Sequence, residues 1–171
     1  PTEGALIASA QKGGLDQAEL VSRLTRLDSI PFESEHQYMA TLHHSENGHS
    51  KTMYIKGAVE KIIERCTDEL NQKNELVPFN KGKILQVSEE MAKNGLRVLA
   101  FGKRTFSSGQ DRISHADAVG GFTFLGLQAM MDPPRQEVIE AIRECKAAGV
   151  KVKMITGDHI LTAIAIAHQI G

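Results

Sequence analysis

The chain has 171 residues, which is enough for one sizeable core or for one domain with part of another. Hydrophobic residues make up 41% and charged residues 24%, as in ordinary water-soluble globular proteins. The net charge of −1 argues against a nucleic-acid-binding module and against a surface for anionic membranes. Cys66 and Cys145 are far apart, so we expect free thiols in a reducing compartment, each on the apolar face of a helix.

The N-terminal third predicts two helices followed by short strands. Gly13-Gly14 ends the first apolar, helix-forming stretch. Asn47-Gly48 lies between two β-type runs and predicts a hairpin turn. The expected segments are a helix between Thr2-Glu3 and Gly13-Gly14, a helix over 16–24 and strands over 30–32, 38–43 and 51–55. Because the chain begins without Met inside helix-forming sequence, we expect it to be a piece of a longer protein.

The middle of the chain predicts two further helices and two strands. Apolar residues recur at helical spacing from Gly57 to Cys66, and Gly95 is a stop signal for a second amphipathic helix. Polar, irregular stretches connect these elements. The expected segments are helices over 57–66 and 82–94, strands over 96–104 and 122–130, a surface loop over 71–80 and a polar excursion over 107–118.

The composition changes at Asp132. The Pro133-Pro134 pair cannot continue a sheet ladder and makes a stiff boundary before a helix that runs to Ala148. A buried strand over 150–155 and a helix over 160–170 are expected next. A single parallel strand is not stable alone, so this tail is expected to begin a second domain. The apolar run from Ile160 to Ala167 is too short to cross a membrane, so we expect no direct membrane insertion.

Seven histidines raise the question of a metal site. His43, His44 and His49 flank the predicted hairpin turn. We interpret them as solvated hairpin residues, and we expect no metal site in the chain.

Three positions in the first 100 residues have the chemistry to contact a ligand. Lys56 ends a strand, and Gly57 lets a ligand or another backbone approach closely before a helix begins. Phe32 follows a proline among polar neighbours, where its ring could stack on a nucleobase or belong to the core. Arg97 places a charge in an apolar strand, so its partner is either a carboxylate or a ligand oxygen.

Two motifs in the last 40 residues have both a structural and a functional interpretation. The segment Asp132-Pro133-Pro134-Arg135 is typical of a loop before a helix, and also of a hinge between two moving domains. In Thr156-Gly157-Asp158, the hydroxyl and carboxylate could cap the following helix. They could also form a phosphate-binding corner at the end of a parallel strand.

Taken together and in this order, the motifs resemble the cytoplasmic part of P-type cation-transporting ATPases, most closely the calcium-pump branch. The resemblance covers essentially the whole chain. It is carried by Pro1–Leu6, Pro31–Ser34, Lys56–Ala58, Leu96–Ala100, Asp132–Arg135 and Thr156–Asp158. It implies an α+β fold with a mainly antiparallel sheet flanked by helices, followed by an incomplete α/β helix–strand–helix segment. It also implies a nucleotide-binding domain over 1–131 and a hinge with a partial phosphorylation domain over 132–171.

The resemblance implies a role for each motif residue. Phe32 would stack on adenine, Glu3 would hydrogen-bond near the base, and Lys56 and Gly57 would line the same pocket. Arg97 would reach the ribose or the phosphates. The hinge would be formed by Asp132, Pro133, Pro134 and Arg135, and the phosphorylation site would be supported by Thr156 and Asp158. Ser34 and Gln37 stand where calcium pumps carry basic residues, so nucleotide contacts from that segment are not expected.

The family's phosphorylated aspartate, in an Asp-Lys-Thr-Gly-Thr motif, does not occur in the sequence. Without that nucleophile the chain is expected to bind ATP and not to hydrolyse it. Its expected partners are ATP, with Mg²⁺ in the longer protein, and the actuator, phosphorylation and transmembrane domains of the same polypeptide. The expected location is therefore the cytoplasmic domain of an integral membrane protein. Two alternatives stay open: a haloacid-dehalogenase-like phosphatase, and a nucleotide-sensing or interaction module without catalysis.

Overall fold

The structure is a computed structural model that describes residues 2–45, 50–107, 109–131, 133–157 and 160–171. The chain divides into two compact units, Pro1–Lys81 with Leu99–Gln128 and Gly82–Val98 with Ala129–Gly171. The helices and strands, in chain order, are α1 (Thr2–Lys12), α2 (Gln17–Arg23), β1 (Arg26–Glu33), β2 (Tyr38–His44), β3 (Ser50–Gly57), α3 (Val59–Ile63), β4 (Cys66–Leu70), β5 (Leu76–Pro78), α4 (Lys81–Lys93), β6 (Arg97–Ser107), the 3₁₀ helix η1 (His115–Ala118), β7 (Phe122–Met130), α5 (Gln136–Ala147) and α6 (Ile160–Ile170).

Within the described residues, seven strands form one sheet in the order β1-β2-β3-β6-β7-β4-β5. The pairs β1–β2, β2–β3, β3–β6 and β4–β5 are antiparallel, and β4 pairs with β7 in parallel. The expected hairpin between β2 and β3 is confirmed by the register His44↔Lys51, although turn residues 46–49 lie outside the described residues. The predicted α+β class, a mainly antiparallel sheet with flanking helices, is confirmed.

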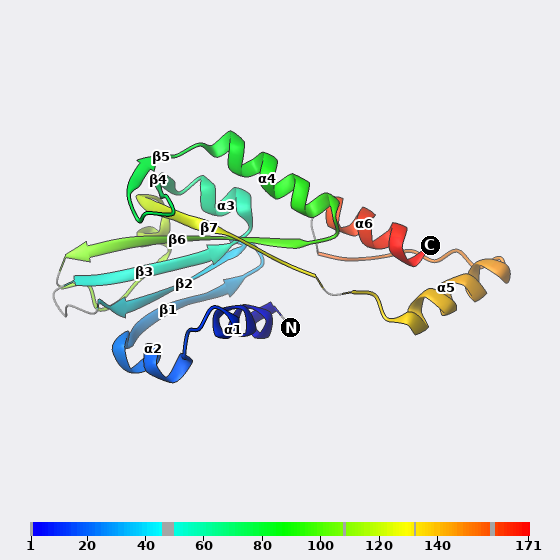
Figure 1. Cartoon of the computed structure of the whole chain (residues 1–171), viewed down its shortest axis with the longest axis horizontal. Helices are drawn as coiled ribbons and strands as arrows, with labels where there is room; N and C mark the ends of the chain where they lie inside the picture. Colours follow the sequence, from blue (N-terminus) through cyan, green and yellow to red (C-terminus); the bar gives the residue numbers. More distant parts are fainter. Residues whose placement is uncertain (1, 46–49, 108, 132, 158–159) are drawn as a thin grey trace. The chain divides into compact units, whose positions relative to one another are not determined.

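The two faces of the β1–β2–β3 sheet differ in what covers them. Along β2, buried Tyr38, Ala40 and Leu42 alternate with half-buried Met39 and Thr41, which is the period-2 pattern of a strand. Helix α3 lies on one side of these strands, and α1 and α2 lie on the other (Figure 1). The core of this unit also includes the fully buried side chains Met53, Ile55, Ile62 and Phe122.

The prediction of a helix through Cys66 is wrong. Helix α3 ends at Ile63, and Cys66 instead begins β4. The Phe122 N–H donates to the Arg65 carbonyl at 3.0 Å, which ties the chain to β7 just before the strand starts. Pairing with a distant strand therefore overrides the helical spacing of the apolar residues. The thiol of Cys66 is buried, and both cysteines are free as expected.

The expected loop over 71–80 contains a short strand, β5, which pairs with β4. Asn71 closes the turn between them, because its side-chain oxygen accepts hydrogen bonds from the backbone N–H groups of Lys73 and Glu75. Pro78 is tolerated in β5 because this strand lies at the edge of the sheet.

The expected buried strand over 150–155 is not formed. These residues have no strand assignment in the structure, and Ile155 is 97% exposed. The physical reason is that a strand is stable only when its backbone groups pair with a neighbour, and these residues are paired with none among those described. Helices α5 and α6, on either side of residues 150–155, form as expected. Helix α5 starts after Arg135 rather than at Pro134.

We predict that Gly57→Ala destabilises the sheet. A β-carbon at this position would lie 2.3 Å from the Gln37 carbonyl oxygen and 2.7 Å from the Tyr38 Cα, and both of these are backbone atoms. The cost should be about 1–3 kcal/mol or more of unfolding free energy, measured by urea denaturation followed by circular dichroism.

The matched control is Gly4→Ala in α1, where an added β-carbon meets no atom within 4 Å. Alanine favours a helix by up to about 1 kcal/mol over glycine, so this variant should be neutral or more stable. Equal unfolding midpoints for the wild type and Gly57→Ala would show that the backbone yields easily at Gly57.

Candidate functional site

Lys56 and Glu3 come together although 53 positions separate them. Lys56 is the penultimate residue of β3, and Glu3 lies in the first turn of α1. The Lys56 ammonium donates a hydrogen bond to the Glu3 carboxylate and forms an ion pair with it. The Lys56 side chain is only 20% exposed, while that of Glu3 is 68% exposed. The ion pair therefore attaches the start of α1 to the end of β3.

A cavity of about 230 Å³ opens beside this ion pair. Its lining includes Glu3, Lys56, Met39, Tyr54 and Phe101. Pockets for complete ligands usually measure about 300–1,000 Å³, so this one has room for part of a nucleotide, such as a base.

Gly57 is the point of closest backbone approach at this end of the sheet. It pairs with Tyr38 across β2 and β3, and Ala58 N–H donates to the Gln37 carbonyl at 3.0 Å. Because an added β-carbon would overlap backbone atoms of Gln37 and Tyr38, only glycine fits without a shift. Of the two sequence-based interpretations of Gly57, the close approach of another backbone segment is the one seen here.

Phe32 is not a core residue. It lies near the end of β1, where the pairing with β2 is irregular between Ile30 and Glu33, and it is 60% exposed. An exposed aromatic ring at the end of an edge strand is available for stacking. The ring does not line the cavity that contains Glu3 and Lys56.

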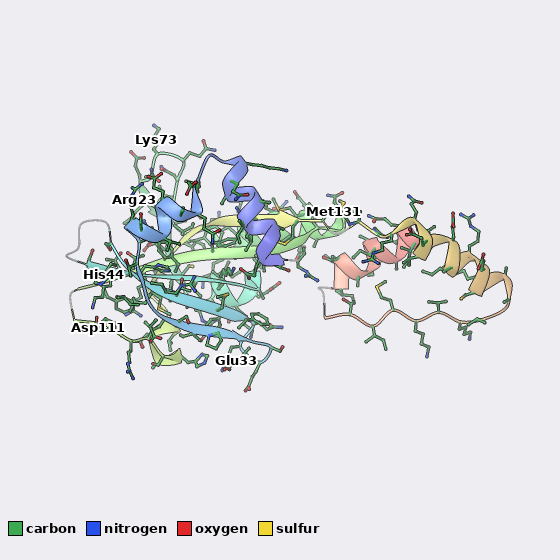
Figure 2. The ribbon with its side chains drawn as sticks, turned by 90° about the horizontal axis from the view of Figure 1, so that it is seen from below. Arg23, Glu33, His44, Lys73, Asp111 and Met131 are labelled. Carbon is green, nitrogen blue, oxygen red and sulfur yellow. The ribbon has the colours of Figure 1, made fainter. Side chains whose placement is uncertain are left out.

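The strand register places Phe32 and Lys56 at the same end of the sheet. Glu33 pairs with Tyr38, and Tyr38 pairs with Gly57, so one row of residues crosses β1, β2 and β3. Phe32 and Lys56 each precede a member of this row. Figure 2 shows Glu33 at this end of the β1–β2 hairpin and His44 at the opposite end.

Comparison with known proteins decides the family. Residues 1–137 match the family model described as P-type ATPase, cytoplasmic domain N. The chain belongs to the P-type ATPases. Among its relatives, cation-transporting ATPase pma1 of Synechocystis is 53% identical over 171 residues, which are all of this chain and 19% of that protein. Calcium-transporting ATPase 1 of Bacillus cereus is 39% identical over 174 residues, again 100% of this chain and 19% of the relative.

The predicted relationship to P-type cation-transporting ATPases of the calcium-pump-like branch is thus confirmed. A further relative, the probable cation-transporting ATPase F of Mycobacterium tuberculosis, is 41% identical over the whole of this chain and 19% of its own length. The matched segment is the cytoplasmic domain N of this membrane-protein family. The chain spans about a fifth of the length of these relatives. Among the described residues, no helix combines the length and apolarity that a membrane span needs.

Among the remaining P-type ATPase motif residues, Arg97, Pro133, Pro134, Arg135 and Thr156 lie in the second compact unit. Arg97 is the first residue of β6, and Thr156 is exposed after the irregular segment 150–155. Pro133 and Pro134 precede Arg135, whose extended backbone forms the N-cap of α5. The motif residues Pro1, Asp132 and Asp158 lie outside the described residues. The roles of all these residues stay predictions.

The histidines of this P-type ATPase domain are arranged differently from the sequence interpretation. His43 donates through Nδ1 to the Leu24 carbonyl at 3.0 Å, so it ties β2 to the end of α2. His49 lies outside the described residues. A group that sequence reasoning missed lies at the other end of the hairpin, where Glu33, His36 and His115 place one ligand atom each within 4.8 Å of one another. Glu33 and His36 are close in sequence, but no local pattern links them to His115.

We predict that the two thiols of this domain react differently. Burial of Cys66 raises its pKa to about 12, so its reactive thiolate is almost absent at pH 8. Cys145 is half-buried in α5. In native protein at pH 8, Ellman's reagent should modify Cys145 first, and Cys66 only after denaturant is added. The variant Cys145→Ser should then show no rapid reaction; a rapid reaction in this variant would contradict the buried position of Cys66.

Proposed function

We propose that this chain is the ATP-binding domain of a cation-transporting P-type ATPase. The observation that carries the proposal is the joint position of Phe32 and Lys56 at one end of the sheet. An aromatic ring that is 60% exposed offers a stacking surface for adenine. The Lys56–Glu3 pair supplies a cation and a carboxylate beside the cavity, which has room for a further part of the nucleotide.

In the proposed complex each group has a distinct task. The adenine ring stacks on Phe32, and its exocyclic amino group donates to the Glu3 carboxylate. Lys56 lines the same site. Gly57 lets β3 pack closely against β2, and this packing keeps Lys56 at the site. Arg97 contacts the ribose or the phosphates.

The proposed function of the longer protein follows from the family. ATP bound with Mg²⁺ would transfer its γ-phosphoryl group to an aspartate elsewhere in the polypeptide. The actuator and transmembrane domains would use that step to move a cation across a membrane. Because relatives at 36–40% identity are named calcium-transporting ATPases, Ca²⁺ is the ion that we favour.

We assign residues 1–131 to the nucleotide-binding domain and residues 132–171 to a hinge and part of the phosphorylation domain. Pro133 and Pro134 restrict the backbone at the start of the second part. Thr156 and Asp158 would support the phosphorylation site from that part. The exposed apolar side chains Val150, Val152 and Ile155 fit a strand that finishes folding only beside its neighbours in the longer protein.

The chain should bind ATP weakly. One stacked base and a few hydrogen bonds amount to about −4 to −5 kcal/mol, which corresponds to a Kd on the order of a millimolar. Removing the ring in Phe32→Ala should weaken binding by roughly 10-fold or more, measured by chemical-shift titration with ATP.

The matched control is Leu76→Ala, which removes another exposed apolar side chain, in β5, and should leave the affinity unchanged. Lys56→Ala should also weaken binding. If Phe32→Ala binds as the wild type does while Lys56→Ala does not, the base occupies the cavity and the stacking role of Phe32 is wrong.

The chain by itself should not hydrolyse ATP. It lacks the Asp-Lys-Thr-Gly-Thr nucleophile, so phosphate release in the presence of Mg²⁺ and ATP should equal that of a protein-free blank. Release that scales with protein concentration, and that Phe32→Ala reduces, would reveal a nucleophile that the sequence does not indicate.

A further inference from the structure

Glu33, His36 and His115 converge at the end of the β1–β2 hairpin. Glu33 ends β1, His36 lies in the turn that follows, and His115 begins the 3₁₀ helix η1. The Glu33 carboxylate oxygen Oε2 lies 3.4 Å from His36 Nε2 and 3.8 Å from His115 Nε2. The two imidazole rings have their centroids 4.2 Å apart. Two ring nitrogens therefore face one carboxylate oxygen.

We propose that Glu33, His36 and His115 bind a divalent transition-metal ion of the zinc class, with water completing its coordination. At Zn–ligand distances of about 2.0–2.1 Å, neighbouring ligand atoms of a tetrahedral site are about 3.3 Å apart. The 3.4 Å and 3.8 Å separations are already close to that edge length. All three ligand atoms lie within 4.8 Å of one another.

The surroundings of His115 fit a metal ligand. Its Nδ1 is hydrogen-bonded to the Tyr38 hydroxyl at 2.7 Å, and Tyr38 is 2% exposed. When Nδ1–H donates to that hydroxyl, the lone pair of His115 is on Nε2, the atom that faces Glu33. Metal-binding histidines usually have such a partner on their other nitrogen, because it fixes the tautomer and the ring orientation.

The segment that carries His115 is held at several points. The Ile113 N–H donates to Asp28 Oδ2 at 2.9 Å, and Ser114 and Asp117 form a capping box around η1. Arg104 donates through Nη1 to the carbonyl oxygens of Asp117 and Gly120, each at 3.0 Å. These contacts place His115 opposite the hairpin turn before any ion binds, which reduces the entropic cost of assembling the site.

The hairpin turn that carries His36 is also fixed. The N–H groups of His36 and Gln37 both donate to the Glu33 carbonyl, at 3.1 Å and 2.8 Å. The side chains of Glu33, His36 and His115 remain 49%, 37% and 42% exposed, so an ion can enter from solvent. A hydrated ion would exchange some of its waters for these ligands.

The donor set selects the class of ion. Two imidazole nitrogens and one carboxylate suit Zn²⁺, Ni²⁺ or Cu²⁺, whereas Ca²⁺ and Mg²⁺ prefer sites made of oxygen atoms. The guanidinium of Arg65 lies over the Tyr38 ring, 4.7 Å from its centre. Arg65 donates hydrogen bonds to the carbonyl oxygens of Ala118 and Lys61.

The test is calorimetric titration of the whole chain with ZnCl₂ in a non-chelating buffer. The wild type should bind one Zn²⁺ at this site, and Glu33→Gln, His36→Ala and His115→Ala should each weaken binding by at least about 10-fold. Tyr38→Phe keeps all three ligands and removes only the partner of Nδ1, so it should also weaken binding by roughly 10-fold.

The matched control is His44→Ala, which removes a histidine from the opposite end of the same hairpin and should not change the affinity (Figure 2). The proposal is overturned if the three ligand variants bind Zn²⁺ as tightly as the wild type, or if His44→Ala weakens binding equally. It is also overturned if the wild type shows no saturable binding. Should His115→Ala not fold, the variants Glu33→Gln and His36→Ala decide the question.

Discussion

The close contact of Gly57 with the backbone of Gln37 and Tyr38 is the constraint on which this end of the molecule depends. It lets β3 pack against the β1–β2 hairpin at the point where the hairpin turns. The resulting row Glu33–Tyr38–Gly57 sets the positions of Phe32 and Lys56, which precede members of that row. A bulkier residue at position 57 would separate the strands and move both groups.

The same row lies beside two different groups of polar residues. On one side, the Lys56 ammonium pairs with Glu3 beside a cavity on the face of the sheet that α1 and α2 cover. On the other side, Tyr38 orients His115 toward Glu33 and His36. Both groups of polar residues are therefore held by the same end of one sheet.

Local signals in the sequence predicted most of the elements and the family. Gly95 stops α4 in a positive-φ conformation, and β7 has the predicted bounds, Phe122 to Met130. Elsewhere the local signals predicted the wrong element, because strand pairing between distant segments decided the structure. Cys66 begins a strand because β7 lies beside it, and residues 150–155 form none because they pair with no strand in the described part of the chain. The approach of His115 to Glu33 depends on the fold of the segment between them, which local spacing does not encode.

The proposed binding site depends most directly on where the purine of bound ATP lies. Nuclear Overhauser effects between the H2 and H8 protons of bound ATP and the side chains of the isotope-labelled chain would locate it. We expect contacts from the adenine protons to the ring protons of Phe32. Contacts confined to cavity residues such as Met39 and Phe101, with none to Phe32, would contradict the proposed site.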